Sequence, residues 1–441
     1  MGGIFSAQNK TRPGVYINFK GVSRPLSSLG VRGVVTLAIA MGWGAEVTEL
    51  YSTDLLDGKS LAKIGYSAFD EQSQTVREAL KHCYKAILYR LDTGGVKATA
   101  SIAPLTITAK YAGVVGNSIS VSVVANGAAF NVITFYRGVQ VDLQTQTVVA
   151  DLESNEWVDF SGTGNLVANA GVTLSTGANG TISEATYTTY LNTIKAYQWN
   201  VMGIPQDSAS VNAAIVAFIK SQRDTYGKLV QAVLYDIDED YEGIISVAQG
   251  YATDTETVSP TTFVAYVAGL TAGADVAQSN TYHVVTGATS IVYPVGVTPY
   301  GDEEIEAALK AGKFVLSTRQ DGVVVVEQDI NTLHNFTVDR SYAFSKNRVI
   351  RTLDEISNSI SLLFKQSFIG KVNNDEFGRT LFKGNVISYI NALQGAGAIQ
   401  GFDSLTDIEV RAGLAIDAVV VDLAIKPVDS MEKLYMTVMV D

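Results

Sequence analysis

The sequence contains a single cysteine, Cys83, among its 441 residues. One cysteine cannot form a disulfide within the chain, and it cannot supply a zinc site made of cysteines alone. These two kinds of covalent or metal support are therefore excluded. The composition fits a protein that folds and assembles in a reducing cytoplasm.

Charged residues are also scarce, at 17% of the chain, and basic residues are the minority among them. Thirty-two lysines and arginines stand against 44 acidic residues, which gives a net charge of −12 without any basic run. A nucleic-acid-binding protein should carry a basic patch, so this function is not expected. A hydrophobic content of 47% indicates a globular chain rather than a disordered one.

Long apolar runs are absent as well. The most apolar run, Val34–Met41, is far shorter than the ~20 residues that span a bilayer. The first residues lack the charged start and apolar core of a signal peptide. We therefore expect a soluble protein that is made in the cytoplasm, does not insert into membranes, and leaves the cell only by lysis.

Histidine, the commonest catalytic base, occurs three times, as His82, His283 and His334. His82 lies next to Cys83 in a predicted helix, but a catalytic dyad is defined by geometry and not by adjacency in the sequence. No G-x-S-x-G motif, which presents the nucleophile of many hydrolases, is present. The histidines are predicted to be structural.

Two short segments resemble ligand loops but lack the residue that each loop requires. Residues 53–60 end like a P-loop but begin with Thr53 instead of the glycine that lets the backbone close around phosphate. Residues 236–243 resemble the start of a calcium loop, but Tyr241 replaces its glycine and Val247 its final glutamate. We predict no catalytic residues, no cofactor and no metal.

The length is sufficient for two to four domains, and the first segment, residues 21–95, is predicted to be α/β. Residues 33–40 form a continuous apolar run, which is typical of a buried strand. Gln72–Tyr84 has the apolar period of a helix, and residues 86–91 return as a strand. A helix between two strands suggests a crossover unit.

Residues 96–182 are predicted to form an inserted all-β sandwich domain. Short segments rich in Thr, Val, Ser and Gly alternate there, and no helical period appears. The clearest strands are residues 105–109 and 119–124. Helices and strands alternate again over 183–321, a layered α/β domain, and over 322–425, a C-terminal α/β domain.

Each end of the chain is predicted to be an extended strand arm. In the N-terminal arm, residues 1–20, Arg12-Pro13-Gly14 interrupts the chain before a β-branched and aromatic strand. In the C-terminal arm, residues 426–441, Lys426-Pro427 and a polar turn precede a strand with apolar residues at every second position. The residues expected to make contacts are Val15, Tyr16, Ile17, Phe19, Leu434, Met436, Val438 and Val440.

Such terminal strands need the edge of a sheet, which can belong to the same chain or to a neighbouring subunit. Strands that close the chain's own sheet are common at termini. Strands that pair with another subunit are a known mode of assembly. The sequence leaves both arrangements open, and the sheet containing the predicted strand 415–425 is the candidate receiver for neighbours' arms.

The two ends resemble those of the tail sheath proteins of contractile phages and contractile bacteriocins. Arg12-Pro13-Gly14-Val15-Tyr16 is similar to the opening motif of that family, and Lys426-Pro427 followed by a terminal strand is similar to its closing pattern. Residues 109–117 and 368–374 resemble two of its turns. The resemblance extends over essentially the whole chain.

The resemblance implies a structural function. It implies hexameric rings that stack helically around a tail tube, arms that interlock adjacent subunits, and contraction that drives the tube through a cell envelope. The implied partners are further copies of the chain, the tail tube protein, and baseplate and tail-terminator proteins. It further implies a subtilisin-like topology in the middle domain without protease chemistry, and a location in a virion or phage-tail-like particle.

Two other functions are left open by the residues themselves. A hydrolase could be built on the middle α/β domain, although no motif supports a polar site there. A surface or adhesion protein would explain the Thr/Ser/Gly-rich insert, although the lack of a signal peptide argues against export. The sequence does not distinguish an infectious phage from a defective prophage or a bacteriocin.

Deletion of residues 1–20 is expected to give a folded subunit that does not polymerise, because the resemblance implies that this arm interlocks adjacent subunits. Circular dichroism would report the fold, and negative-stain electron microscopy with light scattering would report assembly. Unimpaired assembly of tubes by the deletion variant would contradict the role of the arm.

Overall fold

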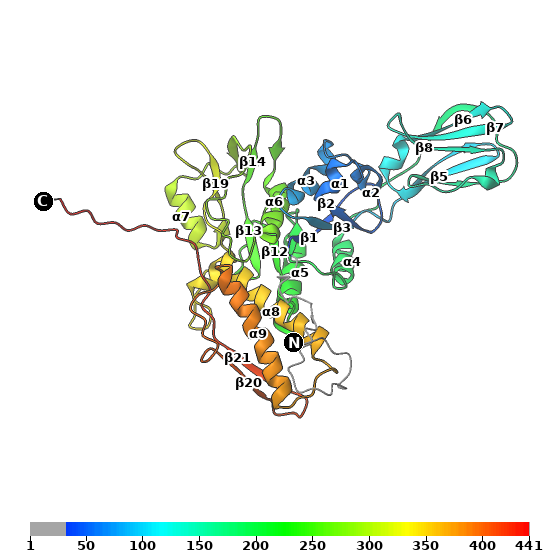
Figure 1. Ribbon diagram of the computed structural model, residues 1–441. Coiled ribbons are helices and arrows are strands. Elements are labelled where there is room, and N and C mark those ends of the chain that lie inside the picture. Colours follow the sequence, from blue (N-terminus) through cyan, green and yellow to red (C-terminus); the bar gives the residue numbers. More distant parts are fainter. Residues whose placement is uncertain (1–31, 441) are drawn as a thin grey trace, which may run out of the picture.

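The computed structural model describes residues 32–440 (Figure 1). The predicted N-terminal contact residues Val15, Tyr16, Ile17 and Phe19 lie outside the described residues. The described part of the chain is mixed α/β with several sheets, as the sequence predicts. None of its helices is long and apolar enough to cross a bilayer.

A seven-stranded sheet forms the centre of the molecule, with the strand order β17-β13-β12-β11-β1-β3-β2. All neighbouring strands are parallel except β2 and β3, which are antiparallel. The strands are β1 Val34–Ile39, β2 Val47–Tyr51, β3 Lys85–Arg90, β11 Val201–Ile204, β12 Gln231–Tyr235, β13 Ile244–Val247 and β17 Lys313–Phe314.

Helices cover both faces of this sheet, which explains the continuous apolar run of β1. All six residues of β1 are buried, with Val35 and Leu37 in the core on one face and Val34 and Ala38 in the core on the other. Two-sided burial is usual for parallel strands. The helices on the first face are α3 Gln74–Leu80 and α6 Pro260–Gly273, and those on the second are α4 Glu184–Ile194 and α5 Ala209–Lys220.

The predicted helix Gln72–Tyr84 is present but shorter. A 3₁₀ turn, η1 Glu71–Ser73, precedes α3, and the chain leaves the helix after Leu80. The backbone N–H of Tyr84 donates to the carbonyl of Gly33, next to β1. Tyr84 therefore belongs to the approach to β3 and not to the helix. The short helices α1 Ser52–Leu56 and α2 Ser60–Ile64 lie between β2 and η1.

Strands from both sides of the insert lie in the central sheet. β1, β2 and β3 come from the predicted segment 21–95, whereas β11, β12, β13 and β17 come from residues 183–321. The two segments therefore form one layered unit that the insert interrupts. Whether this unit has a subtilisin-like topology stays a prediction.

The insert consists of two sheets that enclose a common core, and it contains the strands that were predicted at 105–109 and 119–124. One sheet has the order β10-β6-β7-β8 and the other β4-β5-β9. The strands are β4 Lys97–Ile102, β5 Leu105–Ala112, β6 Ile119–Asn126, β7 Ala129–Tyr136, β8 Val139–Gln146, β9 Val158–Ser161 and β10 Asn169–Thr173, with 3₁₀ turns η2 Val114–Ser118 and η3 Val149–Asp151.

An aromatic stack joins the insert to the central unit. Trp43, which follows β1, stacks on Trp157 of the insert with ring centroids 5.4 Å apart, and Trp157 stacks on Tyr136 at 4.4 Å. The Tyr136 hydroxyl donates to the carbonyl of Gly65 at 2.5 Å. All three rings are buried, so the insert has a fixed position on the sheet.

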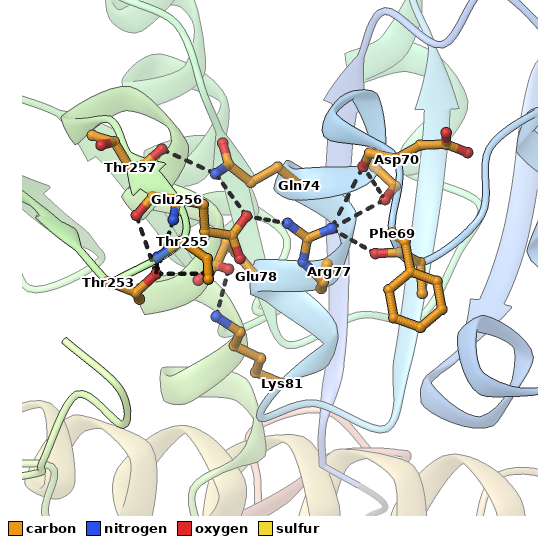
Figure 2. Close-up of polar contacts among 12 residues, drawn as sticks. Phe69, Asp70, Gln74, Arg77, Glu78, Lys81, Thr253, Thr255, Glu256 and Thr257 are labelled. Atoms are coloured by element: carbon orange, nitrogen blue, oxygen red, sulfur yellow. Dashed lines mark hydrogen bonds and ion pairs between the residues drawn. The ribbon is translucent and has the colours of Figure 1, made fainter.

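Polar side chains along one face of α3 connect it to the turn between β14 Gly250–Ala252 and β15 Thr257–Val258 (Figure 2). Gln74 Nε2 donates to the carbonyl of Thr257 at 3.0 Å, and Arg77 forms an ion pair with Glu256. β14 also pairs with β16 Ser290–Val292. The helix is therefore held by the sheet core on one face and by this small sheet on another.

The next elements cover the β17 edge of the central sheet. α7 Asp302–Lys310 precedes β17, and β18 Leu316–Thr318 pairs with β19 Val324–Val326. This hairpin spans the predicted domain boundary at 321–322. The antiparallel pairing keeps residues on both sides of that position in one unit.

The C-terminal region packs two long helices against a two-stranded hairpin, with a core of its own. The predicted strand 415–425 is shorter than expected, because residues 413–418 form the hairpin turn. The elements are η5 Tyr342–Ser345, α8 Asn347–Ser367, α9 Glu376–Gly395, β20 Ile408–Ala412 and β21 Val419–Leu423; the remaining turn, η4 Ser221–Thr225, follows α5.

Replacement of Trp43 with alanine is expected to loosen the insert, because it empties a fully buried site in the aromatic stack. Trp→Ala substitutions in cores cost about 3–5 kcal/mol. Limited proteolysis should then cleave near residues 93–97 or 178–182, where the insert joins the sheet. Tyr226→Ala, at an exposed ring elsewhere, is the matched control and should leave the pattern unchanged.

Candidate assembly surfaces

The last residues of the described chain extend away from the body without a strand partner in residues 32–440 (Figure 1). The four predicted contact side chains are strongly exposed: Leu434 at 86%, Met436 at 74%, Val438 at 68% and Val440 at 89%. Exposure of apolar side chains to water is unfavourable, and it is relieved only when another surface covers them. Within the predicted C-terminal arm, residues 433–440 thus form an exposed apolar segment that no described part of the chain covers.

Glu432 fixes the point where the arm leaves the body. Its Oε1 accepts a hydrogen bond from Thr281 Oγ1 at 2.8 Å, and its Oε2 accepts one from Gln328 Nε2 at 2.6 Å. Lys346, directly before α8, forms an ion pair with the same carboxylate. We call Thr281, Gln328 and Lys346 the Glu432 socket.

The electrostatics of the socket favour the charged form of Glu432. Burial acts to raise the pKa of this carboxyl, but the hydrogen bonds from Lys346, Gln328 and Thr281 outweigh burial and hold the pKa below its usual range. The Lys346 side chain is only 3% exposed, so it depends on Glu432 for its counter-charge. The pair therefore anchors the chain directly before the exposed segment 433–440.

A second set of contacts holds the chain just before the socket. Pro427 forms an antiparallel bridge with Ile399, beyond the end of α9. The N–H of Val428 donates to the carbonyl of Ala398 at 3.0 Å, and the N–H of Gln400 donates to that of Lys426 at 2.9 Å. The chain is thus fixed up to Glu432 and unpaired after it.

The hairpin β20–β21 has the features of a strand receiver. In the described part of the chain, neither of its outer edges pairs with a further strand. Ile408 of β20 belongs to the C-terminal core, and α9 packs on this strand. Such an edge presents unpaired N–H and C=O groups that another strand can use.

The predicted residues are not brought together within one chain. Leu434, Met436, Val438 and Val440 lie on the extended arm, away from the hairpin (Figure 1). Glu432, Thr281, Gln328 and Lys346 were not singled out by sequence analysis. Only Glu432 lay in the predicted polar turn, and its three partners are distant in the sequence.

The histidines have structural surroundings. The rings of His82 and His283 lie 5.2 Å apart, and His82 also packs edge-on against Tyr266. Burial, together with the neighbouring His283, lowers the pKa of His82 to about 4. Among the described hydrogen bonds, none joins a serine hydroxyl to a histidine, and no group of acidic, histidine or cysteine residues in residues 32–440 could hold a metal ion.

The acidic segment 236–243 uses its carboxylates within the chain. Asp236 pairs with Lys313 at 2.5 Å, and Asp240 Oδ1 accepts from the N–H groups of His334 and Asn335. Cys83 is buried, and burial raises the pKa of its thiol to about 12. A thiol in this state is a poor nucleophile.

Comparison with known proteins assigns most of the chain to one family. Residues 93–179 match the phage tail sheath protein beta-sandwich domain, residues 180–332 match the phage tail sheath protein central domain, and residues 339–441 match the phage tail sheath C-terminal domain. The first of these matches covers the insert, and the last covers the hairpin and the arm.

A similar fold is found in the helical sheath of the anti-feeding prophage in its contracted state. The TM-score is 0.57 at 13% identity, and the match covers 98% of this chain and all of the other. A likeness at this identity shows a shared fold.

Closer relatives match over their full length. The phage-like element PBSX protein XkdK of Bacillus subtilis is 33% identical, and the match covers 100% of both chains. The sheath tail protein of Desulfitobacterium hafniense has a TM-score of 0.82 at 38% identity, covering 96% of this chain and 99% of that chain. That of Listeria innocua has a TM-score of 0.80 at 33% identity, covering 93% and 95%. The chain therefore belongs to the phage tail sheath protein family.

Proposed function

We propose that the chain is the structural subunit of a contractile tail sheath, which polymerises as stacked hexameric rings around a tail tube and contracts to drive the tube through a cell envelope. The observation that carries the proposal is the C-terminal arm, anchored at Glu432 and unpaired beyond it. Membership of the sheath family supports it.

In this proposal the arm of one subunit adds a strand to the β20–β21 hairpin of a neighbour. The hairpin supplies a free edge, and the arm supplies main-chain groups and one apolar face. Each fully buried apolar side chain contributes about 1.5–3 kcal/mol relative to its exposed state. The four apolar residues at alternate positions would therefore stabilise the join substantially, in addition to the hydrogen bonds of the added strand.

The N-terminal arm has the same role in the proposal. Val15, Tyr16, Ile17 and Phe19 would add a second strand to a neighbouring subunit. Two arms per subunit connect each copy to two others, so a ring becomes part of a continuous lattice. A connected lattice can change the orientation of its subunits without losing its joins.

Contraction would use the bodies rather than the arms. Strand pairs resist pulling, whereas side-chain contacts between the α/β bodies can be broken and made again. At ~25 cal/mol per Å² of apolar area, a few hundred Å² of additional burial per subunit gives several kcal/mol. No nucleotide is needed for this mechanism, and we propose no enzymatic activity.

The partners of such a subunit are the tail tube protein, baseplate proteins and a tail terminator. The location is a virion or a phage-tail-like particle that assembles in the bacterial cytoplasm. The alternatives are a hydrolase and an adhesion protein, and no contact among residues 32–440 supports either.

Replacement of Glu432 with glutamine is expected to raise the critical concentration for tube assembly about tenfold, which corresponds to about 1.4 kcal/mol. The substitution keeps the shape of the side chain but leaves Lys346 without its counter-charge. Sedimentation and electron microscopy would measure assembly, and circular dichroism would confirm the fold. Glu156→Gln, at an exposed position in the insert, is the control. Equal assembly by both variants would contradict the anchoring role.

The pH dependence of assembly should follow the carboxylate of Glu432. Because its pKa in the folded chain is lowered, its stabilising contribution is complete above the ordinary glutamate value of about 4.3 and is lost as the pH falls through the lowered value. Wild-type tubes should therefore weaken in this acidic range, and Glu432→Gln should weaken less between neutral and acidic pH. Identical pH profiles measured by light scattering would oppose this assignment.

A further inference from the structure

Phe69 lies in the loop between α2 and α3 with 97% of its side chain exposed. Figure 2 shows it on the far side of Arg77 from Glu256. Single exposed apolar residues are common and need no explanation by themselves. Phe69 differs from other exposed apolar residues because the loop that carries it is held by hydrogen bonds.

This loop is held by hydrogen bonds on both sides of Phe69. The N–H of Ser67 donates to Asp70 Oδ2 at 2.6 Å, and Arg77 Nη1 donates to the carbonyl of Ala68 at 2.6 Å. Arg137 of the insert donates to Asp70 Oδ1 at 2.8 Å. A side chain on a loop that is already ordered loses little backbone entropy when it binds.

A surface groove lies beside α7, and its lining combines aromatic and aliphatic residues with charged ones such as Asp302, Glu306 and Arg319. Its volume is about 920 Å³, and the rings of Tyr293 and Tyr300 meet edge to face in it with centroids 5.2 Å apart. We call it the α7 groove. Its apolar lining comes from Ile291, Tyr293, Tyr300, Ile305, Leu309 and Leu316.

The loop and the groove lie toward opposite edges of the central sheet. α7 leads into β17, which is one edge strand, whereas the Phe69 loop follows α2, which packs on β2 at the other edge. Figure 1 shows α7 and α3 on opposite sides of α6. Within one chain the two features cannot meet, but between two copies placed side by side they can.

The α7 groove also adjoins the start of the C-terminal arm. A second cavity of about 460 Å³ shares Tyr282, Leu309 and Glu327 with the groove and extends to Glu432 and Lys433. A neighbour that covers the start of the arm would therefore lie beside the α7 groove. This continuity selects a second copy of the chain as the occupant.

We propose that Phe69 of one subunit inserts into the α7 groove of the next, as a contact between bodies that supplements the arms. The proposal rests on the proposed sheath function. Its geometry is heterologous, since two different surfaces meet, and repetition of such a contact generates rings or helical filaments. Aromatic residues in pockets are typical hot spots of protein interfaces.

Crosslinking between copies tests the contact. Glu71→Cys and Thr318→Cys place thiols beside Phe69 and at the groove, both at exposed positions. The native Cys83 is buried and should not react. Assembled particles that contain both variants should give crosslinked dimers with a short bis-maleimide, whereas Glu156→Cys mixed with Thr318→Cys should not.

Phe69→Ala provides the second measurement. It is expected to raise the critical concentration for assembly about tenfold without changing the circular dichroism spectrum, and Tyr226→Ala should not. Wild-type assembly with no crosslink above the Glu156 control, or with no effect of Phe69→Ala, would overturn this inference alone. Failure of the wild-type chain to form rings or tubes, with its tube protein present, would overturn the sheath function and this inference together.

Discussion

A buried ion pair between Arg223 and Asp354 sets the relation between the two main parts of the molecule. Two guanidinium nitrogens of Arg223 donate to the two carboxylate oxygens at 2.6 and 2.9 Å, and both side chains are almost fully buried. Bidentate pairs fix orientation as well as distance. Asn358 adds two hydrogen bonds to the backbone of Leu229, so α8 has one position on the sheet unit. Lys346 directly precedes α8 and pairs with Glu432, so the position of α8 also sets the point where the arm begins.

The sequence predicts those elements whose pattern is set by local neighbours. The apolar run of β1, the helical period that contains α3 and the alternation in the insert were all predicted from the sequence. α6 was missed, because Pro260–Gly273 is buried on nearly every side and so has no polar face to reveal a helical period. The joining of strands across the insert was also missed, since sheet order depends on contacts between residues distant in the sequence.

The same distinction applies to the assembly surfaces. Alternating apolar residues at 434–440 marked the arm, because a period of two is a property of the segment itself. The Glu432 socket had no such signal. Thr281, Gln328 and Lys346 come from three separate segments, and each alone is an ordinary polar residue. Phe69 was equally inconspicuous, because its exposure is a property of the folded loop.

The attachment of the insert has a consequence for how the chain can vary. The chain enters and leaves the insert side by side, with Val96 bridged to Ala178 and the N–H of Gly180 bonded to the carbonyl of Asp92 at 3.0 Å. The distance from β3 to α4 is therefore set by these contacts between residues 92–96 and 178–180, and not by the number of residues in the insert. Hairpins of the insert can lengthen, shorten or change sequence while the central sheet keeps its register. The insert can therefore be exchanged for another of the same attachment, whereas the central sheet and the C-terminal region cannot.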